Sequence, residues 1–233
     1  MPRRQDLSYW QTRVRRLADL EGDLHVSDAE IAQAISEVYG DLYHLVADGA
    51  DAYFQTTYSI AADGSASYRE PDDHMSTVVF ELVETSGDRW PLRRLEAQER
   101  HLFNTAQTGD AEAYSLIDNA LFLYPKPTSG TYELLYIPQP PDITSYSGTD
   151  LIDVVNIYGE QFLIHGAAAI VLSKSEADLR FHMARQARAE EKLKEWAAQR
   201  SFHDPHTQTI GDDVNGPRSS RFGPGGWPRT EVP

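Results

Sequence analysis

Residues 26–47, VSDAEIAQAISEVYGDLYHLVA, combine a helix start signal with one continuous apolar face. Ser27 is placed to accept the backbone N–H of Glu30, and the Glu30 carboxylate can reach back to the Ser27 N–H, which is a capping box. Val26 and Ile31 stand where a hydrophobic staple belongs. The apolar residues that follow recur every three or four positions: Ile31, Ile35, Val38, Leu42 and Leu45. These features predict an amphipathic helix that ends near residue 47.

The segment before this helix has the same period. Its apolar residues are Leu7, Trp10, Val14 and Leu17. Arg13, Arg15 and Arg16 stand between them, as on an amphipathic helix with a solvated basic face. The first 50 residues therefore predict two helices.

From about residue 53 the apolar period changes to two. Short aromatic and β-branched segments are separated by turn-forming residues such as Asp118 and Asn119. The segments are YFQTTYSI (53–60), STVVFELVET (76–85), AYSLI (113–117), ALFLY (120–124) and TYELLYI (131–137). They predict a small antiparallel sheet, with a short helix over residues 95–103 inside it.

Two further helices are predicted after the strands. Residues 150–172 form a strongly apolar segment that is too short to span a bilayer and is typical of a buried core helix. Residues 175–200 mix charges with a sparse apolar stripe, and this pattern fits a solvated face and a contact between subunits equally well. The apolar residues assigned to such a contact are Leu179, Met183, Leu193 and Trp196.

Residues 201–233 differ from the rest of the chain. They hold 5 Gly and 5 Pro in 33 positions and show no apolar period, so they are not expected to form a core of their own. Large apolar and arginine side chains are nevertheless spaced along them, and such side chains often anchor interfaces. The anchor residues are Phe202, Ile210, Val214, Arg218, Arg221, Phe222, Trp227 and Arg229. This segment is therefore predicted to be an extended tail that becomes ordered on a partner.

The overall charge argues against DNA binding as the main activity. The 233 residues carry 21 Lys and Arg against 36 Asp and Glu, a net charge of -15, and 16 of the acidic residues fall within 51–150. Such a surface opposes binding to phosphates. With 40% hydrophobic residues the chain can still bury a core. The absence of Cys excludes disulfides and thiol nucleophiles, and no signal peptide or membrane span is expected, which fits assembly in a cytoplasm.

No catalytic motif, metal site or cofactor site is predicted. His203, Asp204 and His206 have ligand chemistry, but they lie in the loose tail, where a solvated segment is the better reading. Glu96, Glu99 and His101 could form an acid–base cluster, although local ion pairs on an exposed helix explain them better. His165 is read as a hydrogen-bonded histidine of the core or of an interface.

The order of these elements resembles the adaptor, or head completion, proteins of tailed bacteriophages over nearly the whole chain. The most specific pieces are PLRR (91–94) with ER (99–100), LYPKP (123–127) followed by LYIP (135–138), and Arg200 leading into HDP (203–205). The resemblance implies an α+β fold, in which a helical bundle of two N-terminal and two C-terminal helices carries an inserted small antiparallel β region and an extended C-terminal tail. The corresponding boundaries are 1–50 and 143–200 for the helical core, 51–142 for the β-rich insertion and 201–233 for the tail.

The resemblance also implies a structural role without enzymatic activity. Such proteins form a ring of twelve subunits beneath the portal of the DNA-filled head, at the neck of a virion assembled in the host cytoplasm. Their helices pack between subunits, their C-terminal tail docks on the portal, and the ring continues the DNA channel toward the next neck or tail component. DNA passes through the lumen without sequence-specific binding, and no membrane is involved.

One function of another class was also weighed. A carbohydrate-binding or hydrolytic protein would carry its site on the β region, through the aromatic residues Tyr124, Tyr132 and Tyr136. Such a site requires a deep pocket with paired carboxylates. The sequence pairs none convincingly, since Glu133 simply alternates with Leu134 on a strand.

Overall fold

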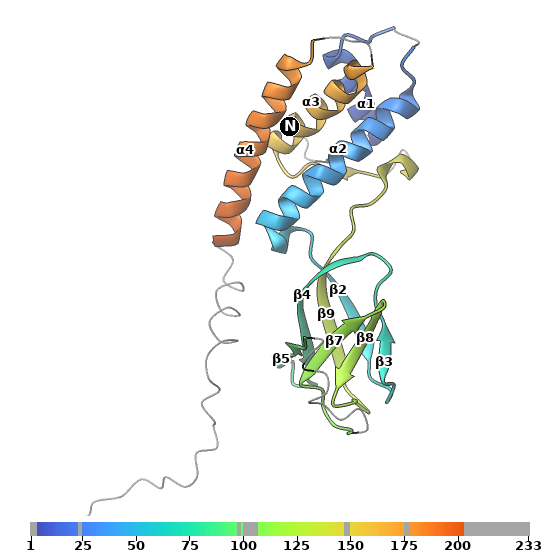
Figure 1. Ribbon diagram of the computed structural model, residues 1–233, viewed down its shortest axis with the longest axis vertical. Helices are drawn as coiled ribbons and strands as arrows, with labels where there is room; N and C mark the ends of the chain where they lie inside the picture. The colour runs from blue at the N-terminus through green and yellow to red at the C-terminus, as the bar shows by residue number, and fades with distance from the viewer. Residues whose placement is uncertain are drawn as a thin grey trace, which may run out of the picture.

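A computed structural model describes residues 4–22, 25–96, 99, 107–146, 150–174 and 178–202. The fold is α+β, and Figure 1 shows the helices at one end of the molecule and the strands at the other. The helices are α1 (Leu7–Leu17), α2 (Asp28–Gly49), α3 (Ile157–Ser173) and α4 (Arg180–Phe202). The strands are β1 (Arg4–Gln5), β2 (Thr56–Ala61), β3 (Ser67–Arg69), β4 (His74–Val83), β5 (Arg89–Pro91), β6 (Arg93–Arg94), β7 (Ala113–Ile117), β8 (Ala120–Tyr124), β9 (Thr131–Pro138) and β10 (Ile152–Asp153).

Side-chain caps fix where the helices begin. The capping box at α2 is confirmed: the Ser27 N–H donates to the Glu30 carboxylate at 2.9 Å, and the Glu30 N–H donates to Ser27 Oγ at 3.2 Å. Asn156 Oδ1 accepts the N–H groups of Tyr158 and Gly159 and so caps α3. The helix predicted from residue 150 therefore begins later, at Ile157.

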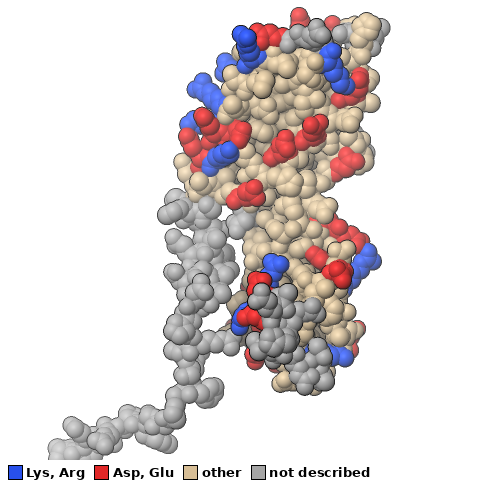
Figure 2. Space-filling view, in the orientation of Figure 1, with Lys and Arg blue, Asp and Glu red and all other residues tan. Residues whose placement is uncertain are grey.

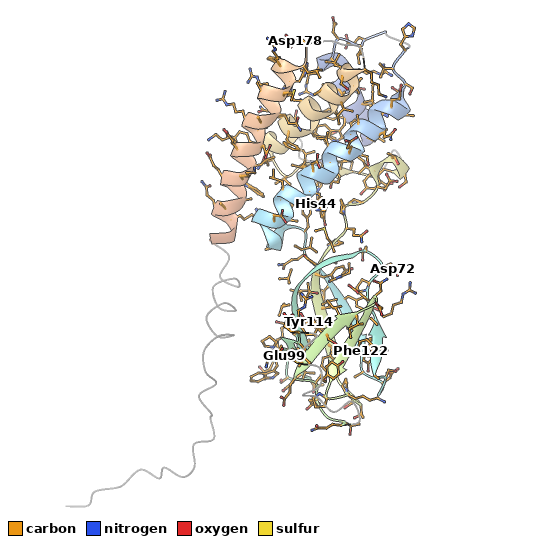
Figure 3. All side chains as sticks on the ribbon, viewed as in Figure 1. His44, Asp72, Glu99, Tyr114, Phe122 and Asp178 are labelled. Atoms are coloured by element: carbon orange, nitrogen blue, oxygen red, sulfur yellow. The ribbon has the colours of Figure 1, made fainter. Side chains whose placement is uncertain are left out.

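The start of the last helix also differs from the sequence prediction. Helix α4 begins at Arg180 instead of residue 175, and residues 175–177 lie outside the described part of the chain. The carboxylate of Asp178 accepts the N–H of Arg180 at 3.0 Å, which gives the first turn a side-chain partner. Figure 3 shows Asp178 at this end of α4.

The β region consists of two four-stranded sheets, whereas the sequence predicted one small sheet. Their strand orders are β2-β9-β4-β5 and β3-β8-β7-β6. The predicted antiparallel pairing is confirmed for the described strands of this region, with one exception: β6 pairs with β7 in parallel. Phe80 and Leu134 of the first sheet and Tyr114 and Leu121 of the second belong to the same buried cluster. The additional strands β3, β5 and β6 are only two or three residues long, too short to show a period in the sequence.

The turn between β7 and β8 forms as predicted. Asp118 and Asn119 both adopt positive φ, 48° and 62°, and Ile117 pairs with Ala120 across them. A two-residue hairpin turn with positive φ at both positions matches the twist of the strands and favours Asn and Asp. The short helix predicted over 95–103 lies mostly outside the described residues, and Leu95 instead donates its N–H to the Tyr114 carbonyl oxygen beside β6.

Helix α3 lies at the centre of the helical part and contacts α1, α2 and α4. Leu163, Ala167 and Ala168 are fully buried, as the apolar sequence of this segment predicts. Two glycines permit the close approach. A Cβ on Gly159 would lie 1.9 Å from the Val154 carbonyl oxygen, and one on Gly166 would lie 2.7 Å from both Gln186 and Val38.

Replacing Gly159 by Ala is therefore expected to destabilise the protein by more than about 3 kcal/mol, because the new methyl group meets backbone that cannot rotate away. Gly40→Ala is the matched control, since Gly40 lies within α2 with no atom within 4 Å of the added Cβ. That variant is expected to gain about 1 kcal/mol from helix propensity. Urea unfolding of both variants measures the difference, and equal effects would contradict the packing described for α3.

Candidate interaction surfaces

The predicted docking tail is not tested by the structure. Phe202 is the last residue of α4, and nothing is described of its side chain. The other seven anchors lie outside the described residues: Ile210, Val214, Arg218, Arg221, Phe222, Trp227 and Arg229. The same holds for His203, Asp204 and His206. The tail therefore remains a prediction.

The four residues predicted to face a neighbouring subunit lie in different environments. Leu193 is fully buried in the core of its own chain, and the Trp196 ring packs edge-on against Tyr53 at 5.7 Å. Leu179 is half-buried, and Met183 is 58% exposed. The apolar surface of Leu193 is thus already covered within the subunit, while Met183 offers a free side chain on α4.

The structure adds an exposed aromatic residue on α4 that sequence reasoning did not identify. Phe181 is 56% exposed and packs edge-on against the His165 ring of α3, with centroids 5.8 Å apart. Arg185 lies one turn further along, with its guanidinium 5.6 Å from the Phe181 ring centroid, and Arg188 follows at helical spacing. We call Phe181, Arg185 and Arg188 the basic–aromatic stripe. A signal was present, because the first ten residues of α4 contain three Arg and no acidic residue.

A second stripe of opposite charge runs along α2. Helix α2 contains no Lys or Arg, and Glu37, Asp41 and Asp48 are exposed at intervals of four and seven residues. We call these three residues the acidic stripe. His44 lies between Asp41 and Asp48 and is labelled in Figure 3. Beside Glu37 is a groove of about 540 Å³, lined also by Ser36 and Asp142 among other residues.

The two stripes lie on different sides of the helical part. Figure 2 shows acidic side chains spread over the face toward the viewer, where Figure 1 places α2. Along the left edge, which α4 forms, basic side chains lie at the upper end, and basic and acidic side chains are mixed further down. The subunit therefore presents opposite charges in two directions.

Most other charged side chains on these helices are paired within the chain. Lys192 pairs with Glu195, Lys194 with Glu190, and Lys174 with Glu30 of the α2 first turn. Across the described ranges, no ion pair is formed by Glu37, Asp41 or Asp48, nor by Arg185 or Arg188. The two stripes therefore hold unmatched charges of one sign each, although Arg180, Glu191 and Arg200 of α4 also form no ion pair among the described residues.

Another groove lies where the helices meet the strands. It has a volume of about 950 Å³, and Arg4, Tyr53, Asp153 and Arg200 are among its lining residues. Arg4 Nε donates to the Asp153 carboxylate at 2.9 Å, and the Tyr53 hydroxyl donates to the same carboxylate at 3.2 Å. The Arg200 guanidinium lies 5.2 Å from the Tyr53 ring centroid. These polar groups contact one another, so they hold the joint between the two parts of the molecule.

The tyrosines considered for a carbohydrate site are buried. Tyr132, Tyr124 and Tyr136 are 0%, 4% and 6% exposed. The Tyr136 hydroxyl donates to Asp73, and the Tyr132 hydroxyl accepts the N–H of Ala111. Buried rings cannot stack on a sugar, so these residues form the core of the β region and not a binding platform.

The predicted acid–base cluster is only partly described. Glu99 forms an ion pair with Arg93 and accepts the N–H of Glu96, while His101 lies outside the described residues. The part that is seen is a local ion pair, as the alternative interpretation expected. Within the described residues, no three His, Asp or Glu side chains lie close enough together to hold a metal ion.

His165 is buried, and its partner is a second buried histidine. Its Nδ1 lies 3.3 Å from Nδ1 of His182 on α4, so the pair joins α3 to α4 beneath Phe181. Burial, together with the smaller effects of the neighbouring His182 and Arg185, lowers the pKa of His165 to about 4. Burial also lowers the pKa of His182. Both rings are therefore neutral at pH 7.

Comparison with known proteins gives one result. A family model described as SU10 adaptor protein matches residues 6–211, which include all four helices and both four-stranded sheets. No curated protein matches the sequence. None of the described helices has both the length and the apolarity that crossing a bilayer requires.

The histidine pair makes the free energy of unfolding depend on pH. An unfolded chain binds protons on these rings near pH 6.5, whereas the folded chain keeps His165 neutral down to about pH 4. The free energy of unfolding is therefore expected to fall between pH 6.5 and pH 4, by on the order of 3 kcal/mol. Urea unfolding of a His165→Leu/His182→Leu variant across this range is expected to show a shallower slope than the native chain. His44→Ala, at an exposed position, is expected to keep the native slope, and equal slopes in all three proteins would contradict this account.

Proposed function

Because the chain belongs to the SU10 adaptor protein family, a family of phage head-to-tail adaptors, we propose that it forms a ring that joins the portal of the DNA-filled head to the tail. The chain is thus a phage adaptor protein, a component of the virion that associates with other virion components. The observation that carries the proposal is the family match over residues 6–211. Four parts of the proposal go beyond family membership: the ring, the portal contact, the DNA channel and a role without catalysis.

The distribution of charge supports the channel. The acidic excess is concentrated in residues 51–150, which contain 16 acidic and 6 basic side chains. An acidic surface beside a DNA conduit repels phosphates and lets the genome slide, whereas a basic lining would hold it.

The two stripes support assembly with other chains. Exposed side chains of like charge that find no partner within the subunit repel one another, and an oppositely charged neighbour relieves that repulsion. A structural component that meets several neighbours at once requires more than one such surface.

The portal contact is assigned to the C-terminal tail. Residues 203–233 follow directly on α4, and fully extended they reach on the order of 100 Å. A segment without a core of its own loses conformational entropy when it docks, so it needs strong anchors. Phe222 and Trp227 supply apolar anchors, and Arg218, Arg221 and Arg229 supply charged ones.

Deleting residues 203–233 is expected to leave the fold intact, because the buried clusters involve residues before 198. It is expected to abolish incorporation of the protein into heads that carry a portal but lack the adaptor. Circular dichroism measures the fold, and gel analysis of purified particles measures incorporation.

A finer comparison uses substitutions within the full-length chain. Phe222→Ala/Trp227→Ala is expected to reduce incorporation, while Ser219→Ala/Ser220→Ala, between the arginines, is the matched control and is expected to leave it unchanged. Normal incorporation of the truncated chain would disprove tail docking.

A further inference from the structure

We propose that neighbouring subunits contact one another head to tail, with the basic–aromatic stripe of α4 on one copy against the acidic stripe of α2 on the next. This inference rests on the proposed ring and names the surfaces that form it. It is carried by two sets of exposed charges of opposite sign, each unmatched among the described residues of its own subunit.

The spacing of the charges suits a contact between two helices. Arg185 and Arg188 are three residues apart, about 4.5 Å along the axis of α4. Glu37 and Asp41 are four residues apart, about 6 Å along the axis of α2. Each guanidinium can therefore face a carboxylate when the two helices lie side by side.

An aromatic anchor adds apolar contact to the charges. Phe181 is 56% exposed at the start of the stripe, with Arg185 stacked over its ring. On the opposite surface, the groove of about 540 Å³ beside Glu37 is lined mainly by polar side chains, including the Asp142 carboxylate, so it adds polar partners for the arginines more than an apolar pocket for Phe181. Exposed ion pairs alone contribute little, whereas an aromatic side chain that is covered on binding is a common source of interface affinity.

The arrangement of the stripes determines the symmetry of the contact. A two-fold interface could pair the two stripes only if both lay in one face of the subunit, and if it were centred on a single stripe it would place like charges against one another. A head-to-tail contact instead brings the basic stripe of one copy to the acidic stripe of the next and leaves one free stripe at each end. Repetition of such a contact closes into a ring when the rotation per subunit divides a full turn.

A second copy of the chain fits the stripe better than nucleic acid does. The basic stripe contains only two arginines, and the acidic residues Glu190, Glu191 and Glu195 follow it on the same helix. Binding to a phosphate backbone requires many more cations than this. A neighbouring subunit, in contrast, presents three carboxylates in a row.

The experiment reverses each stripe separately and then both together. Variant one is Arg185→Glu/Arg188→Glu, variant two is Glu37→Arg/Asp41→Arg, and variant three combines all four substitutions. Sedimentation velocity and native mass measurement at low salt give the size of the assemblies, because salt screens contacts of this kind.

Variants one and two are each expected to associate at least about tenfold more weakly than the native chain, since like charges meet in both. Variant three is expected to regain most of the association, because the reversed stripes are again complementary. A mixture of variants one and two is expected to assemble by alternation of the two variants, because both contacts between unlike variants bring opposite charges together, and rings with an even number of subunits can then close.

Two controls change the net charge equally at exposed positions elsewhere. Arg16→Glu/Arg69→Glu matches variant one, and Glu21→Arg/Asp72→Arg matches variant two. Both controls are expected to assemble as the native chain does. A loss of assembly in the controls would mean that overall charge, and not the two stripes, governs association, and the inference would fail.

The outcomes separate this inference from the proposed function. Native rings that persist in variants one and two would disprove the α2–α4 contact and leave the ring in place. A native chain that stays monomeric at low salt would also overturn the contact, and incorporation into adaptor-less heads would then test the adaptor role alone. Assembly that follows the stripes, in a chain that never enters particles, would support the contact and refute the proposed function.

Discussion

The helical part depends on how closely α3 can approach its neighbours. Gly159 lies against the Val154 carbonyl oxygen, and Gly166 lies against Val38 of α2 and Gln186 of α4. The Glu160 carboxylate is nearly buried beside them, and its ion pair with Arg13 at 2.9 Å ties α1 to α3. A buried carboxylate without its cation would cost several kcal/mol, on the order of 3–5, so this pair also fixes the position of α1. The exposed surfaces of α2 and α4 therefore hold fixed positions relative to each other, because both helices pack on this one element.

Local signals in the sequence predicted the elements that short-range contacts determine. The capping box at Ser27 and the turn at Asp118 and Asn119 involve neighbours within four residues, and both form as expected. Contacts between distant residues left weaker signals. Strand β10 pairs with β1, 149 residues away at Arg4 and Asp153, so no local pattern predicts that residues 152–153 form a strand. The capping residue Asn156 is a local signal for the start of α3, which the prediction from apolar residues alone overlooked.

The candidate surfaces show the same limit. Leu193 and Met183 both belong to the apolar stripe of a charged helix, but one is buried and the other is 58% exposed. Period alone does not distinguish them, because α4 packs in the groove between α2 and α3 and hides the side that carries Leu193. The charges of the two helices carry a clearer signal for exposed surfaces than the apolar period does. Helix α2 contains no Lys or Arg, and the first ten residues of α4 contain three Arg and no acidic residue. The spatial separation of the two required the structure.

The path of the chain between α2 and α3 has a consequence for how the β region varies. Strand β2 is the first strand of the β region and β9 is the last, and the two are paired, with Thr56 opposite Tyr136. Where the chain returns from β9 to the helical part, the Tyr43 hydroxyl donates to the Pro138 carbonyl oxygen. The two ends of the insertion are thus held together by their own pairing. To the helices the whole segment is equivalent to a short loop, because the entropy of closing a loop depends on the distance between its ends and only weakly on its length. Apart from Met75 and Val78 of β4, which pack against the helical core, the strands between these ends are free to lengthen, shorten or change sequence over evolutionary time while the four helices keep one arrangement.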